Sequence, residues 1–174
     1  MSHVRHPVLS PTSVPPPLDA SRFTSANRRR LSGPAMRTFL AIADLWALSQ
    51  EERLLVLGLP SRSTYYGWVK AARDGDDVTL PTDTLLRISA VLGIHKALRI
   101  LFPADAEGVA WLRGPHAALP FAGQPPIALV LGGTQDGLML VRRFLDAARG
   151  GLFMAPNAAD DRAVALSDED IVFA

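Results

Sequence analysis

Basic and hydroxyl side chains gather in one short segment, residues 60–73, which reads PSRSTYYGWVKAAR. A guanidinium group such as that of Arg62 can pair with guanine through two hydrogen bonds, while hydroxyl and ammonium groups contact phosphates. This set of side chains is typical of a helix that reads DNA. The candidate contacts are Arg62, Ser63, Thr64, Tyr65, Lys70 and Arg73.

The aromatic residues of the same segment allow a second interpretation. Trp68 and at least one of Tyr65 and Tyr66 are expected to pack inward and hold the helix on the core, because large rings are usually buried when a core is near. Which tyrosine faces outward is left open by the spacing.

A run of three arginines, Arg28, Arg29 and Arg30, precedes the first periodic segment. Residues 1–30 carry five Arg and one acidic residue, Asp19, so this segment is strongly basic although the net charge of the whole chain is only +1. Such an arm can track phosphates or enter a minor groove. The alternative is a solvated terminus without a DNA contact.

Enzymatic chemistry is poorly supported. The chain has no cysteine, which excludes thiol nucleophiles and thiolate metal sites. The glycine-rich run at 132–137 lacks the Lys-Ser/Thr ending of a phosphate loop, and the four His show no metal-ligand spacing. We therefore expect no catalytic residue, metal or cofactor.

Helix signals place the basic segment in a helix-turn-helix. We expect a first helix from Pro34, with Ser32 as its cap, after a flexible arm that is rich in Pro, Ser and Arg. Ser49 and Glu52 form a capping box for a second helix ending at Gly58. The third begins with Ser61 or Ser63 as its cap and ends at the turn 74–77.

The rest of the chain also reads as helical. A helix capped by Thr82 is expected to be interrupted at Gly93 and to resume over 95–102, followed by helices over 104–113, 126–131 and 135–149. No segment alternates as a strand does. The prediction is an all-α protein in which a helix-turn-helix module precedes a small helical module. The expected segments are an arm at 1–30, a helix-turn-helix module at 31–103, a second module at 104–158 and a tail at 159–174.

Between Val109 and Gly151 the residue types fall at intervals that amphipathicity alone does not demand. The positions concerned are Trp111, Leu112, Pro115, Leu119, Gly123, Pro125, Pro126, Leu129, Gly132, Gly137, Val141 and Leu145. Their spacing resembles the C-terminal toxin-binding module of the MbcA/ParS/Xre-type antitoxins. One departure is His116, where that family usually has Asn.

The resemblance implies a non-enzymatic antitoxin that neutralises a cognate RES-domain toxin, an NAD-consuming protein, and represses its own operon. It implies toxin contacts at Trp111, Pro115 and Leu119. It also implies that the tail reaches the toxin's NAD-binding cleft, where carboxylates would replace phosphates and apolar side chains would fill space. The tail residues concerned are Asp168, Glu169, Asp170, Ile171, Val172 and Phe173. A disordered acidic terminus is the alternative reading of the tail.

The expected partners are the toxin and operator DNA, bound by a homodimer or a larger hetero-oligomer with the toxin. The apolar stripes at 98–101 and 138–145 are either dimer surfaces or core. The sequence shows no signal-peptide pattern and no apolar run long enough for a membrane span, so we expect a cytoplasmic protein without a membrane partner. Two alternatives remain: a transcriptional regulator whose C-terminal half senses a ligand or partner, and an adaptor that does not bind DNA.

Overall fold

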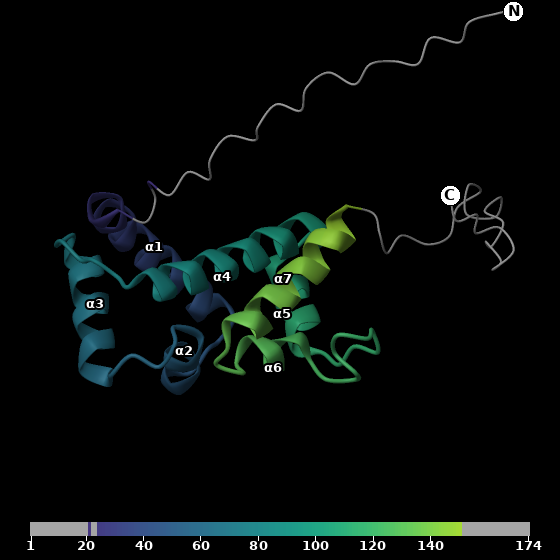
Figure 1. The fold of residues 1–174 in the computed structure, drawn as a ribbon. Coiled ribbons are helices and arrows are strands. Elements are labelled where there is room, and N and C mark those ends of the chain that lie inside the picture. The colour runs from purple at the N-terminus through teal and green to yellow at the C-terminus, as the bar shows by residue number, and fades with distance from the viewer. Residues whose placement is uncertain (1–20, 22–23, 151–174) are drawn as a thin grey trace, which may run out of the picture.

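The structure is a computed structural model, and it describes Ser21 and residues 24–150. Within that part every regular element is a helix, which confirms the all-α prediction (Figure 1). The elements are α1 (Ser25–Leu45), α2 (Gln50–Val56), α3 (Arg62–Asp74), α4 (Thr82–Leu101), α5 (Asp105–Arg113), α6 (Pro126–Val130) and α7 (Gln135–Arg149).

Helix α4 is the element on which the others assemble. It packs against α1 along one part of its length and against α7 along another, and α5 also contacts it. α3 rests on α1, and α6 rests on α7. Figure 1 shows the result: α1, α2 and α3 lie at one end of α4, and α5, α6 and α7 lie at the other.

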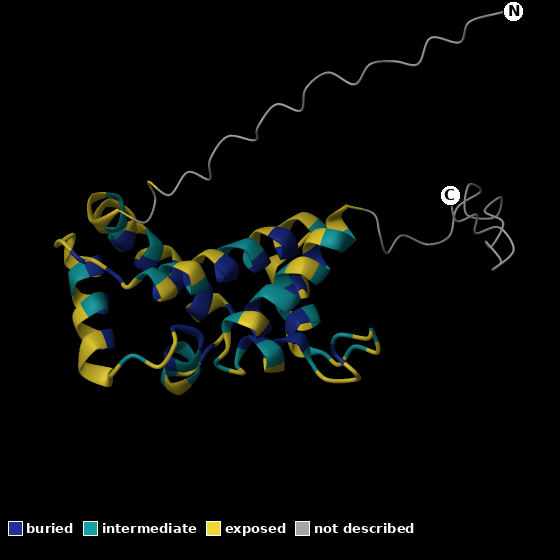
Figure 2. Ribbon diagram, viewed as in Figure 1, coloured by how far each residue is buried: buried dark blue, intermediate teal, exposed yellow. Residues whose placement is uncertain are grey.

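In Figure 2 the buried residues lie mainly on the parts of the helices that turn toward neighbouring helices. Trp46, Phe39 and Met36 are the largest fully buried side chains of the α1 end, and Leu112 and Leu138 are fully buried at the α7 end. All belong to one hydrophobic cluster that continues along α4. The two modules therefore share a core.

The first helix begins earlier than the sequence suggested. Thr24 is its N-cap, with its side chain accepting a hydrogen bond from the Asn27 backbone, and Pro34 lies inside the helix. The expected flexible arm at 1–30 is thus wrong for residues 25–30, which are helical. Residues 1–20 lie outside the described part of the chain.

The physical reason lies in Ser32, which is fully buried and is no cap. Its hydroxyl donates to the Arg28 carbonyl at 2.7 Å and accepts from the Leu80 N–H at 2.9 Å. Arg28 donates to the Leu80 carbonyl at 3.2 Å. These tertiary bonds to the α3–α4 connection stabilise a helical turn that Pro34 alone would not predict.

Helix α4 is continuous, so the expected interruption at Gly93 is also wrong. A Cβ at position 93 would lie 2.6 Å from Nε of Arg142 on α7. Glycine is therefore explained here by the close approach of another helix rather than by a helix end.

Candidate nucleic-acid interface and protein-binding surface

Helices α2 and α3 form the expected helix-turn-helix. Both halves of the Ser49–Glu52 capping box are present at the start of α2, which confirms that prediction. Ser61 caps α3 by accepting from the Thr64 N–H at 3.1 Å, which settles the choice between Ser61 and Ser63. Residues 57–61 form the turn between the two helices.

Helix α3 turns one face to the core and one to solvent. Its buried residues are Tyr65, Val69 and Ala72, and Trp68 is partly buried against the same cluster. Tyr65 is only 4% exposed, so it is not available to DNA, and its candidate role as a DNA contact is wrong. Tyr66 is the exposed tyrosine of the pair.

The remaining candidate contacts of α3 all lie on the exposed face. They are Arg62, Ser63, Thr64, Lys70 and Arg73. Arg62 forms an ion pair with Glu51 of α2 at 3.0 Å, and Lys70 forms one with Asp74 at 2.5 Å. The hydrogen bond to Asp74 and its charge raise the pKa of Lys70, so the ammonium stays charged. Exposed ion pairs of this kind are weak, so both cations are free to exchange a carboxylate for a phosphate.

Gln50, at the start of α2, is a neighbour of this surface that the sequence did not single out. The Tyr66 hydroxyl donates to Oε1 of Gln50 at 2.7 Å, so the exposed tyrosine is fixed across the two helices. In the sequence, the only indication of a role for Gln50 was its position directly after Ser49, the N-cap of α2. Its contact with α3 depends on the packing of the two helices, which spacing does not give.

The arginine triplet is distributed over the first turns of α1. Arg28 is engaged with the Leu80 carbonyl, and Arg29 forms an ion pair with Asp77. Arg30 is exposed and has no ion-pair partner among the described residues. Only Arg30 of the three is thus an uncommitted cation in the described structure.

The second surface is built on an aromatic cluster at the other end of the molecule. Trp111 of α5 lies 6.1 Å from the ring of Phe144 on α7 and 5.9 Å from that of Phe121, measured between centroids. The ring of His116 lies 4.7 Å from Trp111. Trp111 is only partly buried, so this cluster both supports the module and contributes to its surface.

A closed loop over residues 114–125 projects from this cluster. The Gly123 N–H donates to the His116 carbonyl at 2.8 Å, and the His116 ring contacts the Trp111 carbonyl at 2.8 Å through Nε2. His116 therefore anchors the loop at the position where the sequence departed from the expected Asn. Leu119 stands at the far part of the loop and is 96% exposed, and Pro115 is also exposed.

Two glycines of this module have roles that differ from one another. At Gly123 a Cβ would meet nothing within 4 Å, and its φ of +84° is what favours glycine there. Close approach occurs instead at Gly137, where a Cβ would overlap the Leu129 carbonyl. The start of α7 thereby packs directly on the backbone of α6.

The apolar stripes at 98–101 and 138–145, for which the sequence allowed either a core or a dimer surface, belong mostly to the core. Leu98, Leu138, Val141 and Leu145 are all buried within the described chain. Ile100 is the exposed exception. The tail candidates from Asp168 to Phe173 lie outside the described residues.

The described residues contain neither a membrane-spanning helix nor a metal-ligand cluster. No helix there is both long and apolar enough to cross a bilayer. No three His, Asp or Glu side chains of that part come together as metal ligands would.

Comparison with known proteins supplies two family matches and a relative. A model described as the antitoxin Xre-like helix-turn-helix domain matches residues 25–93, and one described as the antitoxin Xre/MbcA/ParS C-terminal toxin-binding domain matches residues 97–151. The uncharacterized protein y4oB of Sinorhizobium fredii is 40% identical over 116 residues, which are 67% of this chain and 84% of that protein. The first match contains α2 and α3, and the second contains the aromatic cluster and its loop.

Proposed function

Because the chain belongs to the Xre/MbcA/ParS antitoxin family, we propose that it neutralises a cognate RES-domain toxin by covering the toxin's NAD-binding cleft. The observation that carries the proposal is the match of the toxin-binding domain to residues 97–151, where the exposed Leu119 projects from an anchored loop. Leu119, Pro115 and the partly buried Trp111 together offer apolar surface from this loop and its aromatic anchor, as the core of a protein interface requires.

In this proposal Leu119, Pro115 and the exposed edge of Trp111 contact the toxin surface. The tail, from Asp168 to Phe173, enters the cleft, where its carboxylates take the place of NAD phosphates. The protein acts as a binding partner and carries out no reaction. It acts in the cytoplasm, where both the toxin and the operator are found.

The test is co-expression with a RES-domain toxin encoded next to this protein's gene, followed by co-purification and an assay of NAD loss. The variant is Leu119→Asp, and its control is Leu59→Asp, another exposed leucine, which lies in the α2–α3 turn. Leu119→Asp is expected to weaken the complex and restore NAD consumption, while Leu59→Asp leaves neutralisation intact. Equal neutralisation by both variants would remove Leu119 from the interface, and failure of the unchanged chain to bind the toxin would remove the proposal.

We further propose that the helix-turn-helix represses the operon that encodes the protein. The exposed face of α3 would enter the major groove with Arg62, Ser63 and Thr64 at its leading end, while Lys70 and Arg73 contact phosphates. Arg30, and Arg28 and Arg29 once released from their present partners, would add phosphate contacts. A two-fold dimer, or a larger assembly with the toxin, would present two such helices about 34 Å apart.

Gel-shift titration of the DNA upstream of the gene tests this second proposal. Specific retention of that DNA, with affinity falling steeply as salt rises, is the expected result. Binding of unrelated DNA with equal affinity would contradict the proposal that the protein recognises a specific operator.

A further inference from the structure

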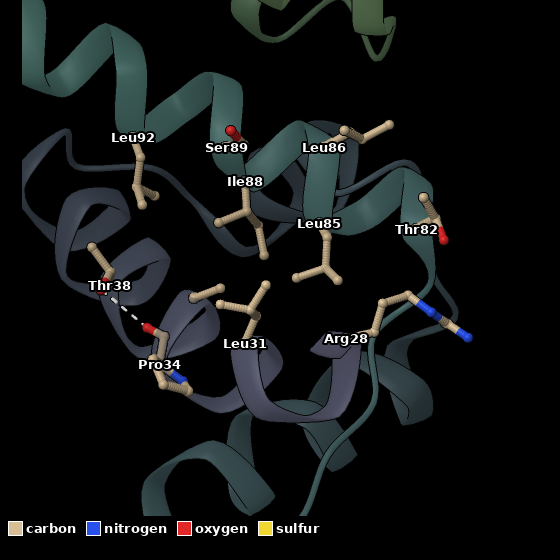
Figure 3. Close-up of a pocket in the computed structure, with 11 residues that line it drawn as sticks. Arg28, Leu31, Pro34, Thr38, Thr82, Leu85, Leu86, Ile88, Ser89 and Leu92 are labelled. Carbon is tan, nitrogen blue, oxygen red and sulfur yellow. Dashed lines mark hydrogen bonds between the residues drawn. The ribbon is translucent and has the colours of Figure 1, made fainter. Parts of the chain in front are cut away.

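An open apolar groove runs between the N-terminal halves of α1 and α4 (Figure 3). Leu31 and Pro34 of α1 face Leu85, Ile88 and Leu92 of α4 across it. The groove has a volume of about 380 Å³, and among the described residues that line it Arg28, at one end, is the only charged one. Leu31 remains 39% exposed, so this apolar surface lacks a cover within the described residues.

Arg28 marks one end of the groove, beside Thr82 (Figure 3). Its terminal nitrogen donates to Leu80, but its Nε is buried and has no hydrogen-bond partner among the described residues. A buried guanidinium donor without a partner is costly, and a carboxylate is the group that satisfies it best.

The chain enters the described structure next to this end. The Ser21 carbonyl accepts from the Thr24 hydroxyl at 2.8 Å and from the Asn27 amide at 2.9 Å, so it is held against the first turn of α1. Arg28 follows on the next turn. The described chain therefore begins at the end of α1 where Arg28 lies, and residues 1–20 precede it in the sequence.

Those residues have the composition that the groove requires. Asp19 is the only acidic residue among the first 30, and it directly follows the apolar run Val14–Leu18, VPPPL. The groove spans about ten residues of α1, or about 15 Å at 1.5 Å per residue. Five residues in a polyproline II conformation also span about 15 Å, at 3.1 Å per residue.

We propose that Val14–Leu18 docks in the groove between α1 and α4, with Asp19 paired to Arg28 at its mouth. The segment runs antiparallel to α1, so that Leu18 lies near Leu31 and Val14 lies near the Thr38 end. A proline-rich segment loses little conformational entropy on docking, and its tether to α1 gives it a high effective concentration. The groove is then an intramolecular binding site for an apolar, proline-rich strand.

Engineered disulfides test the proposal in the full chain, which has no native cysteine. The test pair is Val14→Cys with Ser89→Cys, an exposed position that lines the groove. The matched control pair is Val14→Cys with Thr79→Cys, an exposed position next to Leu80 and thus at the end where the chain enters. Both substitutions on the folded part lie at exposed residues, and circular dichroism confirms that each variant folds.

Docking predicts that the Ser89 pair closes at least about tenfold faster than the Thr79 pair, since a held segment has a higher local concentration at its site than a free tether. Adding Asp19→Asn to the test pair is expected to reduce that advantage. Equal rates for the two pairs, or a faster Thr79 pair, would overturn the proposal. The proposal would also be overturned if a mixture of the Val14→Cys chain and the Ser89→Cys chain formed disulfide dimers as fast as the test pair closes. That result would mean that the groove binds a second copy of the protein.

Discussion

Replacing Ser32 by alanine is a direct measure of how the first turns of α1 are held. Ser32 is fully buried, and its hydroxyl oxygen accepts the Leu80 N–H at 2.9 Å. The same hydroxyl donates to the Arg28 carbonyl at 2.7 Å, one turn earlier in the helix. Ser32→Ala removes both bonds without adding volume.

The two losses differ in size. The Arg28 carbonyl lies in the interior of α1 and keeps its helical partner, so losing the hydroxyl costs it little. The Leu80 N–H, in contrast, is buried and would have no acceptor, at a cost of about 1–3 kcal/mol. With a urea m-value of about 2 kcal/mol/M, the unfolding midpoint should fall by about 0.5–1.5 M.

Thr38→Ala is the matched control. Thr38 also donates its hydroxyl to a carbonyl one turn earlier, that of Pro34 at 3.0 Å, but it is exposed, and no N–H of the described residues donates to it. The control is expected to change stability by less than about 0.5 kcal/mol. Urea unfolding followed by circular dichroism compares the two, and equal midpoints would refute the claim that Leu80 depends on Ser32.

Four further outcomes are expected. Arg62→Gln should weaken binding to upstream DNA and reduce its salt slope by about 1, whereas Arg99→Gln, an equally exposed arginine with its own ion pair, should change neither in gel shifts across salt concentrations. Gly137→Ala should destabilise the protein by about 1–3 kcal/mol in urea unfolding through overlap with α6, while Gly67→Ala, a helical site with open space, should stabilise it. Burial lowers the pKa of His95, against a raising contribution of Asp105, so the unfolded chain binds a proton more readily than the folded one. The contribution of neutral His95 to stability should therefore be complete above pH ~6.5 and decrease as the pH falls below that value. Thermal unfolding at several pH values should show a smaller decrease for His95→Gln. Deleting Asp168–Ala174 should relieve toxin inhibition, seen as NAD loss, while DNA affinity is retained; unchanged inhibition would reject the role of the tail.

Local signals predicted most of the helices because each signal acts within one or two turns. The capping box at Ser49, the cap at Ser61 and the stripe of α7 depend only on neighbours in sequence. Both ends of α7 agree with the expected range of 135–149. The orientation of Trp68 followed from ring size and spacing alone.

The errors arose where a distant contact overrides a local preference. Pro34 suggested a helix start, but Leu80 stabilises two turns of helix before it. Gly93 suggested a helix end, but Arg142 of α7 occupies the space beside it. The choice between Tyr65 and Tyr66 likewise depended on where α1 packs against α3, and the sequence carries no record of that contact.

The two family matches meet on α4, and the structure gives a reason why the modules are not independent. Arg87 of α4 donates to Asp83 at 2.7 Å and to the Gly133 carbonyl, in the α6–α7 turn, at 2.9 Å. A Cβ at Gly58, in the α2–α3 turn, would meet the same Arg87 side chain, and one at Gly133 would contact Leu55 of α2. One largely buried guanidinium thus lies between the turn of the helix-turn-helix and the turn that precedes α7. Because packed interiors transmit small displacements, Arg87 is the side chain through which a shift of the α6–α7 turn would reach the turn that precedes α3.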